Sequence, residues 1–165
     1  QRANTDVLTN LHNRRWFNDM YVQAFTYCKE HNKPACFLMV DVDHFKKYND
    51  TNGHLAGDRA LATVAAVLEH GLKATDLIAR YGGEEFAIFL PDTNGQDGMK
   101  TAQRLCETIA ASQILSSNNQ SLPGVTVSIG LAAISADESH EDLAARADTA
   151  LYKAKSAGRN RATYE

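Results

Sequence analysis

Apolar residues repeat at helical spacing in four segments of the chain. The first runs from Asn13, a favourable N-cap residue, to a stop at residues 32–34, and two others cover residues 54–70 and 96–115. A last helix opens with the capping-box pattern of residues 139–142. Spacings of three and four place the apolar side chains on one face of each predicted helix. The inward residues are Phe17, Met20, Tyr21, Ala24, Phe25 and Cys28, then Leu61, Val64 and Leu68, then Met99, Ala102, Leu105, Cys106 and Ile109, and finally Leu143, Ala147, Ala150, Leu151 and Ala154.

Four shorter segments have the patterns of strands. Residues 36–40 form an unbroken apolar run, which suits a central strand buried on both faces, and residues 125–131 alternate as a half-buried strand does. Residues 77–81 and 86–90 are apolar runs on either side of Gly-Gly-Glu-Glu at 82–85. This pattern predicts a β-hairpin with glycines at its turn and carboxylates at its tip. The order of elements predicts an α/β (α+β) fold with a mixed, mainly antiparallel central sheet covered by helices.

The composition describes one ordinary soluble domain. The chain has 165 residues, with 17 Lys and Arg against 20 Asp and Glu, a net charge of −3, and 44% hydrophobic residues. A chain of this length can bury a core without disulfides or a structural metal. The slightly acidic balance excludes a non-specific nucleic-acid binder and gives no support for contact with a membrane surface. Any phosphate that the protein handles must therefore be bound by local groups.

The cysteines and the chain start bear on the cellular compartment. Cys28, Cys36 and Cys106 are widely spaced and match no metal or redox motif, so we expect reduced thiols in a cytoplasmic protein. No segment has the roughly 20 apolar residues of a membrane span, and the polar start lacks a signal-peptide pattern. The sequence begins without Met, at a stretch that resembles the end of a linker. We expect part of a longer protein and leave an upstream membrane anchor open.

Carboxylates gather at two places that a sheet can bring together. Asp41 and Asp43 follow the predicted strand 36–40, and Glu84 and Glu85 lie at the tip of the hairpin. Oxygen ligands grouped in this way suit Mg²⁺, which takes one or two protein carboxylates and otherwise binds water and substrate phosphates, as in nucleotidyl-transfer sites. The alternative is that Asp and Glu are common at exposed turns. Spacing alone leaves both interpretations open.

The polar segment 44–53 and the helix after it offer groups for a nucleotide. The segment carries Lys46 and is predicted to be a loop, whose backbone N–H groups can hold a polyphosphate beside a lysine. It matches neither common phosphate-loop motif. Asn49 and Asp58 are more specific, because an amide with a donor and an acceptor, together with a carboxylate, can read the N1–H and exocyclic amine of guanine. The alternative is a turn Asn and a helix N-terminal Asp.

Six segments taken together resemble one known family. They are DVLTNLHNRR at 6–15, DVDHFK at 41–46, ND at 49–50 with GH at 53–54 and GD at 57–58, RYGGEEF at 80–86, VSIG at 127–130 and ALYKAKSAGRN at 150–160. In content and order they closely resemble the GGDEF family of diguanylate cyclases, and they span nearly the whole chain. Residues 82–86 have the GGEEF form, one of the two accepted in active members.

The resemblance implies a sheet like that of class III nucleotide cyclases and polymerase palms, with the GGEEF hairpin over the substrate. Two GTP molecules would condense to cyclic di-GMP and two pyrophosphates at the interface of a homodimer. The expected cofactor is Mg²⁺ or Mn²⁺, two ions per active half-site. The family likeness assigns the ions to Asp41, Glu84 and the backbone carbonyl of Val42, while Glu85 would assist the 3′-hydroxyl or a metal. Asp41, Glu84 and Glu85 are thus the expected catalytic residues.

By the same resemblance, three basic residues would bind phosphates, two polar residues would bind guanine, and two further residues would belong to the substrate-binding set. They are, in that order, Lys46, Lys155 and Arg159, then Asn49 and Asp58, then Phe45 and His54. A structural or supporting role is expected for His54, as for Asp43, Arg80 and the Asp6 motif. Residues 1–165 would form a single GGDEF domain, the C-terminal catalytic part of a longer protein of bacterial second-messenger signalling, without nucleic-acid or membrane contact of its own.

One departure and two alternatives complete the sequence interpretation. Lys73-Ala-Thr-Asp76 stands where active members often carry an inhibitory, product-binding RxxD. Lysine keeps the charge but loses the planar fork of arginine, so product feedback through Lys73 and Asp76 is left open. A degenerate module that binds GTP or cyclic di-GMP without turnover is disfavoured by the intact carboxylates. A related dinucleotide cyclase that accepts ATP is disfavoured by Asp58, whose carboxylate would face the unprotonated N1 of adenine.

Overall fold

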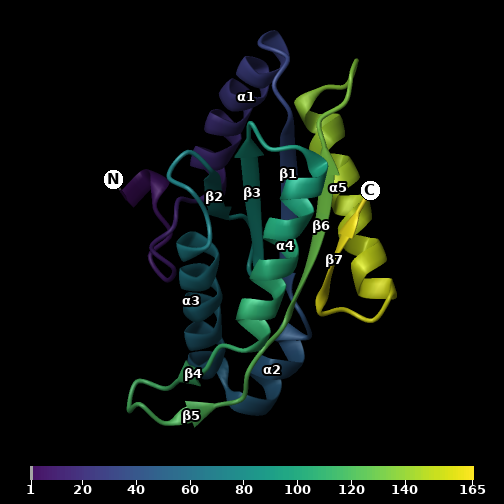
Figure 1. Cartoon of the computed structure of the whole chain (residues 1–165). Coiled ribbons are helices and arrows are strands. Elements are labelled where there is room, and N and C mark those ends of the chain that lie inside the picture. Colours follow the sequence, from purple (N-terminus) through teal and green to yellow (C-terminus); the bar gives the residue numbers. More distant parts are fainter. Residues whose placement is uncertain (1) are drawn as a thin grey trace.

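A five-stranded sheet in the order β2-β3-β1-β6-β7 runs through the middle of the molecule, in a computed structural model that describes residues 2–165 (Figure 1). The β6–β7 pair is parallel and the other pairs are antiparallel, which confirms the predicted mixed, mainly antiparallel sheet. In chain order the elements are η1 (Arg2–Asn4), α1 (Arg14–Glu30), β1 (Ala35–Val42), α2 (Phe45–Asn52), α3 (His54–His70), β2 (Leu77–Arg80), β3 (Glu85–Pro91), α4 (Gly95–Ala110), β4 (Ile114–Leu115), β5 (Ser121–Leu122), β6 (Val127–Ala133), α5 (His140–Ser156) and β7 (Arg161–Tyr164).

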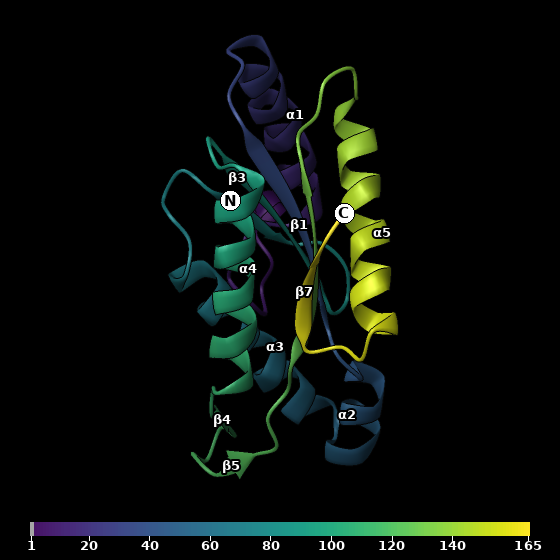
Figure 2. The same ribbon diagram turned by 45° about the vertical axis from the view of Figure 1, so that its right-hand side comes forward.

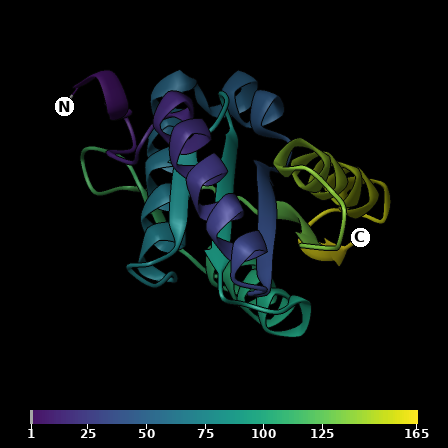
Figure 3. The same ribbon diagram turned by 90° about the horizontal axis from the view of Figure 1, so that it is seen from above.

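Strand β1 is buried along its whole length, and its two faces belong to different halves of the core. Cys36, Leu38 and Val40 pack in the cluster formed with α3 and α4. Phe37 and Met39 pack in the cluster formed with α1 and α5. Figure 2 shows α4 and α5 on opposite sides of the strands, and Figure 3 shows the N-terminal segment and the C-terminal strand at opposite ends of the molecule. Burial on both faces explains the unbroken apolar run of residues 36–40.

The predicted helix starts are confirmed where a side chain caps the helix. Asn13 Oδ1 accepts a hydrogen bond from the Trp16 N–H at 3.1 Å at the start of α1. At the start of α5, Ser139 Oγ accepts from the Asp142 N–H at 3.0 Å, and the Asp142 carboxylate accepts from the Ser139 N–H at 3.2 Å. This reciprocal pair is the predicted capping box. Each capping bond joins residues three apart in the chain and does not depend on tertiary contacts, so these helix starts can be predicted from the sequence.

The prediction of a loop over residues 44–53 is wrong, because Phe45–Asn52 forms the helix α2. His44, at φ 54°, turns the chain out of β1 and into this helix. Tyr48 is buried, and its hydroxyl donates to the carbonyl of Pro123 at 2.7 Å. A helix of only two turns is marginal by itself and depends on such tertiary contacts, which the polar composition of the segment does not reveal.

Two further predictions need correction near the C-terminal half. The helix predicted over residues 96–115 ends at Ala110, because residues 114–115 pair with 121–122 as the small β4–β5 sheet. The following strand accordingly begins at Val127 rather than at residue 125. Strand β7 was not predicted, since its four residues are too few for a periodic pattern and it pairs in parallel with β6 at one end of the sheet.

The three cysteines are free and buried. Burial raises the pKa of the Cys36 and Cys106 thiols to about 12, which leaves them protonated and unreactive at neutral pH. No helix within residues 2–165 is both long enough and apolar enough to cross a membrane.

Candidate active site

The end of β1 and the tip of the β2–β3 hairpin bring the predicted carboxylates to one place. Asp41 lies opposite Glu85 in the β1–β3 register. The N–H of Val42 donates to the carbonyl oxygen of Glu84 at 3.1 Å. Asp41 is buried, whereas Glu84 and Glu85 are half-buried and therefore within reach of a ligand. Backbone pairing thus places Asp41, Glu84 and Glu85 beside each other at a partly open edge of the sheet, and these three residues form the carboxylate cluster.

The glycines keep the tip of the hairpin open and a charged pair fixes it in place. A Cβ atom on Gly83 would meet no atom within 4 Å, so the backbone there can be approached closely. The Arg80 guanidinium donates to the Gly83 carbonyl at 2.7 Å and to the Asp6 carboxylate at 3.2 Å. Asp6 also accepts from the hydroxyl of Thr9 at 2.7 Å. Arg80 and the Asp6 turn therefore hold the hairpin and take no direct part in the carboxylate cluster.

A lysine from the last turn of α5 completes the cluster. Lys155 Nζ donates to Asp41 Oδ2 at 2.7 Å, and the carboxylate of this pair is largely shielded from water. Arg159 follows at φ 64° and Asn160 at φ 50°, and these left-handed residues turn the chain from α5 into β7. The cationic side chain of Lys155 is thus in contact with the carboxylate cluster, and Arg159 follows Lys155 shortly afterwards in the chain.

Asp43 is fully engaged in bonds within the protein. Its carboxylate accepts from the hydroxyls of Thr126 and Ser128, each at 2.6 Å, and from the N–H of Asn160 at 3.0 Å. These bonds join the end of β1 to β6 and to the turn after α5. The geometry therefore gives Asp43 a structural role, in line with the expectation from the family resemblance.

The electrostatic environment of Glu85 differs from that of an exposed carboxyl. Burial raises the pKa of Glu85 above its ordinary value of 4.5, and the negative charges of Asp41, Asp148 and Glu84 raise it further, while Lys155 opposes them. A carboxyl with a raised pKa holds a proton more readily, which suits a group that accepts a proton during a reaction.

The donor atoms at this edge fit a hard divalent cation. Asp41, Glu84 and the Val42 carbonyl offer oxygen only, and Mg²⁺ usually takes one or two protein carboxylates. Within the part of the chain that the structure describes, no group of three or more His, Cys, Asp or Glu side chains is placed to hold a metal ion. The ammonium group of Lys155, held at Asp41 Oδ2, shows that positive charge is accommodated at this carboxylate.

The two residues predicted to bind guanine lie on neighbouring helices. Asn49 in α2 packs against Gly57 in α3, and Asp58 is the next residue of α3. Phe45 contacts the same point from the start of α2. His54 is exposed in the first turn of α3. The contact between α2 and α3 therefore brings Asn49 close to the helix segment that carries Asp58.

Lys46 lies on the exposed side of α2, where it forms an ion pair with Asp50 at 3.1 Å. The two side chains are 90% and 67% exposed, so this pair contributes little to stability and leaves Lys46 available to a ligand.

Lys73 and Asp76 belong to a different place, before β2. They line a pocket of about 320 Å³ together with His12 and Trp16, whose rings stack with centroids 3.5 Å apart. The Asp76 carboxylate accepts from the Lys73 N–H at 2.8 Å. Burial raises the pKa of Asp76. The residues that replace the RxxD pattern thus adjoin a preformed pocket away from the carboxylate cluster.

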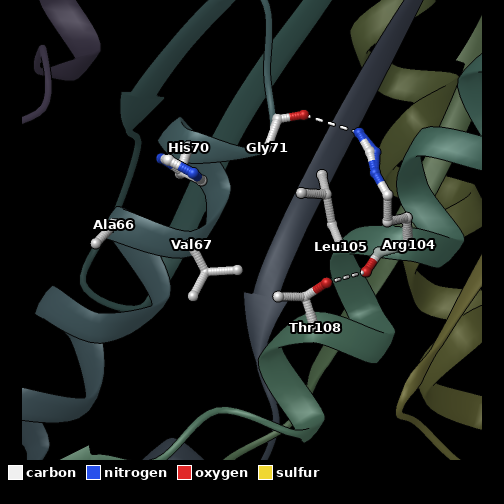
Figure 4. Close-up of a pocket in the computed structure, with 7 residues that line it drawn as sticks. All are labelled: Ala66, Val67, His70, Gly71, Arg104, Leu105 and Thr108. Carbon is white, nitrogen blue, oxygen red and sulfur yellow. Dashed lines mark hydrogen bonds between the residues drawn. The ribbon is translucent and has the colours of Figure 1, made fainter.

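Another pocket, of about 660 Å³, opens between α3 and α4 and contains none of the predicted site residues (Figure 4). Its lining is Ala66, Val67, His70, Gly71, Arg104, Leu105 and Thr108. Arg104 donates to the carbonyl of Gly71 at 2.8 Å and so joins the two helices across it.

Several supporting residues were not predicted from the sequence. The negative charge of Asp148, in α5, raises the pKa of Glu85. Asp148 lies seven residues before Lys155 and therefore on the same helix face, and this spacing could have indicated that it lies near the site. The guanidinium of Arg14 lies 4.2 Å from the ring centre of Tyr81, the residue before the hairpin glycines. This contact joins α1 to the hairpin, and no local pattern in the sequence announces it.

The fold and the acidic hairpin together define an α/β domain of the GGDEF type. A family model described as "Diguanylate cyclase, GGDEF domain" matches residues 3–161. The chain belongs to this family.

Curated relatives resemble the chain over nearly its full length. It is 38% identical over 159 residues to the response regulator PleD of Caulobacter vibrioides, a match that covers 96% of this chain and 35% of PleD. It is 39% identical over 161 residues to the diguanylate cyclase DgcP of Pseudomonas aeruginosa, covering 98% of this chain and 24% of DgcP. The chain therefore spans about a third or less of the length of these relatives.

Solved structures agree with the architecture. The GGDEF domain of DgcB from Caulobacter crescentus, in complex with c-di-GMP, superposes with a TM-score of 0.94 at 37% identity, covering 99% of this chain and 96% of that one. The active GGEEF domain of a diguanylate cyclase from Vibrio cholerae gives a TM-score of 0.84 at 30% identity, covering 92% and 96%.

Proposed function

We propose that this domain is a diguanylate cyclase that condenses two GTP molecules into cyclic di-GMP and two pyrophosphates. The observation that carries the proposal is the meeting of Asp41, Glu84 and Glu85 with the ammonium group of Lys155 at one edge of the sheet. Carboxylates for a divalent cation and a cation for phosphate are the groups that nucleotidyl transfer needs. The GGEEF form of residues 82–86 and the similarity to named diguanylate cyclases support the same reading.

Asp41, Glu84 and the carbonyl of Val42 are the residues proposed to hold Mg²⁺ or Mn²⁺, which when bound supplies positive charge to the transferring phosphate. Lys155 now pairs with Asp41, and a phosphate can take it over once Asp41 has another cationic partner. Arg159 and Lys46 are proposed to bind further phosphate oxygens.

Glu85 is proposed to receive the proton of the attacking hydroxyl. The 3′-oxygen of one GTP bonds to the α-phosphorus of the other, the bond from that phosphorus to the bridging oxygen breaks, and pyrophosphate leaves. The raised pKa of Glu85, caused by burial and then by the neighbouring carboxylates, favours proton uptake at this position.

Asn49 and Asp58 are proposed to bind the guanine base, with Phe45 and His54 beside it. The carboxylate of Asp58 can accept from the N1–H and the exocyclic amine, which adenine does not present together. Since the pair lies on α2 and α3, one domain offers one base site.

Because one domain binds one GTP, the second GTP has to be presented by a second copy. A two-fold homodimer lets each copy offer its 3′-hydroxyl to the α-phosphate bound by the other. Product feedback through Lys73 and Asp76 is proposed to be weak, since lysine cannot bind guanine or phosphate in the bidentate manner of arginine.

The test is to incubate the protein with GTP and Mg²⁺ and to separate the products by chromatography. The proposal expects cyclic di-GMP and pyrophosphate in a ratio of one to two. A domain that only binds nucleotide would return GTP unchanged, and ATP turnover at a matching rate would remove the assignment of guanine specificity.

A further inference from the structure

A glycine in α3 lies directly against the side-chain amide of Asn49. A Cβ atom built on Gly57 would lie 1.7 Å from Asn49 Oδ1 and 2.8 Å from Asn49 Cγ, far inside van der Waals contact. Phe45 Cζ lies 3.2 Å from the same point. The missing side chain of Gly57 therefore leaves the space that the amide oxygen of Asn49 fills.

That oxygen is buried and has no hydrogen-bond partner among residues 2–165. The C–H bond of Gly57 that takes the place of a Cβ points at it, which provides a weak C–H···O contact. The reversed amide would press two unpaired N–H donors against an aliphatic C–H and lose their hydration. Asn49 is thus held with Oδ1 inside the α2–α3 contact, so Nδ2 is the polar atom left for a ligand.

The helix itself gives no reason for a glycine at this position. Gly57 is the fourth residue of α3, where its N–H already donates to the carbonyl of Gly53 at 3.1 Å, and the glycines at positive φ among the described residues are Gly53 and Gly158. Alanine would favour the helix more than glycine does. The close approach of Asn49 therefore accounts for the small residue better than backbone conformation does.

We propose that Gly57 is a positioning residue for base recognition, which fixes Asn49 as a hydrogen-bond donor alone. The inference rests on the proposed function, in which Asn49 and Asp58 bind guanine. Asp58 then supplies the acceptors for N1–H and the exocyclic amine, and Asn49 Nδ2 donates to an acceptor atom of the same base. The two hydrogen-bonding roles are divided between neighbouring helices instead of being combined in one amide.

The experiment measures binding of 3′-deoxy-GTP, which lacks the attacking hydroxyl, by titration calorimetry with Mg²⁺ present. The variants are Gly57→Ala, Asn49→Ala and the double substitution. Gly124→Ala is the matched control, because a Cβ there would meet only one atom, at 4.0 Å. Gly57→Ala and Asn49→Ala should each weaken binding roughly tenfold, the effect of one lost hydrogen bond to the base. The double variant should bind no more weakly than Asn49→Ala, and the control should bind like the unmodified protein.

Thermal unfolding of the same proteins provides the second readout. If Gly57→Ala crowds Asn49, any loss of melting temperature should be relieved in the double variant, where the amide is gone. Unchanged binding by Gly57→Ala would overturn the inference. A double variant that binds more weakly than Asn49→Ala, by the same factor that Gly57→Ala alone causes, would also overturn it. If Asn49→Ala alone leaves binding intact, the role of Asn49 in the proposed function fails and the inference with it. If only Gly57→Ala is without effect, the proposed function stands and the inference alone fails.

Discussion

Single side chains at the end of β1 combine burial with charge. Asp41 is a buried carboxylate, and its Oδ2 accepts a hydrogen bond from the ammonium group of Lys155 at 2.7 Å. A charge in such a place is tolerated because it is paired, and here the partner can be exchanged for a metal ion. The carboxylate of Asp43, two residues further on, accepts hydrogen bonds from Thr126, Ser128 and Asn160. These bonds hold it within the protein, so it cannot exchange a partner for a metal ion in the same way. The neighbouring aspartates therefore separate into a candidate metal ligand and a structural anchor.

Replacing a metal ligand should stop the reaction without unfolding the protein. We expect Asp41→Asn and Glu84→Gln each to reduce cyclic di-GMP synthesis to background, because each removes an anionic oxygen from the cation site. Product formation is measured at matched metal and protein concentration, with circular dichroism to check the fold. Asp19→Asn, the same chemical change on the exposed side of α1, should keep full activity. Near-normal turnover by Asp41→Asn would exclude Asp41 as a ligand.

The base preference should depend on Asp58. Asp58→Ser removes the acceptor for guanine N1–H, so the preference for GTP over ATP should fall by about 1–3 kcal/mol, or roughly 5- to 150-fold. Competition between the two nucleotides during turnover measures the ratio directly. A ratio equal to that of the unmodified protein would mean that Asp58 does not contact the base.

Packing between elements decides where the basic residues of α5 end up. A Cβ atom on Gly130 in β6 would lie 2.1 Å from the backbone N of Leu151 and 2.3 Å from the backbone O of Ala147. These are backbone atoms of α5, which cannot move aside as a flexible side chain can. The glycine therefore lets α5 lie close on the sheet, and this places Lys155 beside Asp41.

Gly130→Ala should destabilise the fold by about 1–3 kcal/mol through overpacking between α5 and β6. Denaturant unfolding with a fitted midpoint and slope measures the change. Gly124→Ala, in open surroundings, serves as the control and should change the free energy of unfolding by much less. Equal stability of the two variants would show that α5 shifts outward at no cost.

The tie between the hairpin and the Asp6 turn should make stability depend on acid pH. Burial works to raise the pKa of Asp6, but hydrogen bonds from Thr9 and the charge of Arg80 outweigh it and lower the pKa below 3.8. A lowered pKa in the folded state contributes stability that is present above pH 3.8 and is lost as the pH falls through the folded-state pKa. In Asp6→Asn this contribution should be absent, so the stability difference from the unmodified protein should shrink as the pH drops below 3.8. A difference that stays constant down to pH 2 would contradict the tie.

The sequence predicted those elements whose signals are local and missed those that depend on distant partners. Asn13 and the Ser139 capping box mark helix starts within four residues of chain, and both are correct. Helix α2 depends on the burial of Tyr48 under Pro123, 75 residues away. In the site, the family motif pointed to Asp41 and the hairpin, but the fixed orientation of the Asn49 amide depends on Gly57 across a helix contact.

At the scale of the whole molecule, the proposed chemistry needs two copies of the domain. Each copy offers one base site and one carboxylate edge, so the attacking hydroxyl and the attacked phosphate belong to different copies. A mixture of a variant lacking Asp58 with one lacking Glu84 should not recover full activity, because every mixed dimer keeps a defect in each half. Recovery to the unmodified rate, measured as product per total protomer, would mean that Asp58 of one copy and Glu84 of the other complete a shared site, and would contradict a base site and a carboxylate edge that act together within each copy.

The most direct test of the account follows the rate of cyclic di-GMP formation per protomer as protein concentration is raised. With dimerisation held only by bound nucleotide, specific activity should climb across the micromolar range, and fusion of a dimerising helix before Asp6 should raise it further by increasing the effective concentration. Sedimentation on the same samples reports the share of dimer. The account predicts that cyclic di-GMP, with two pyrophosphates for each, forms in proportion to that share. Specific activity that stays flat down to concentrations where only monomer sediments would contradict it.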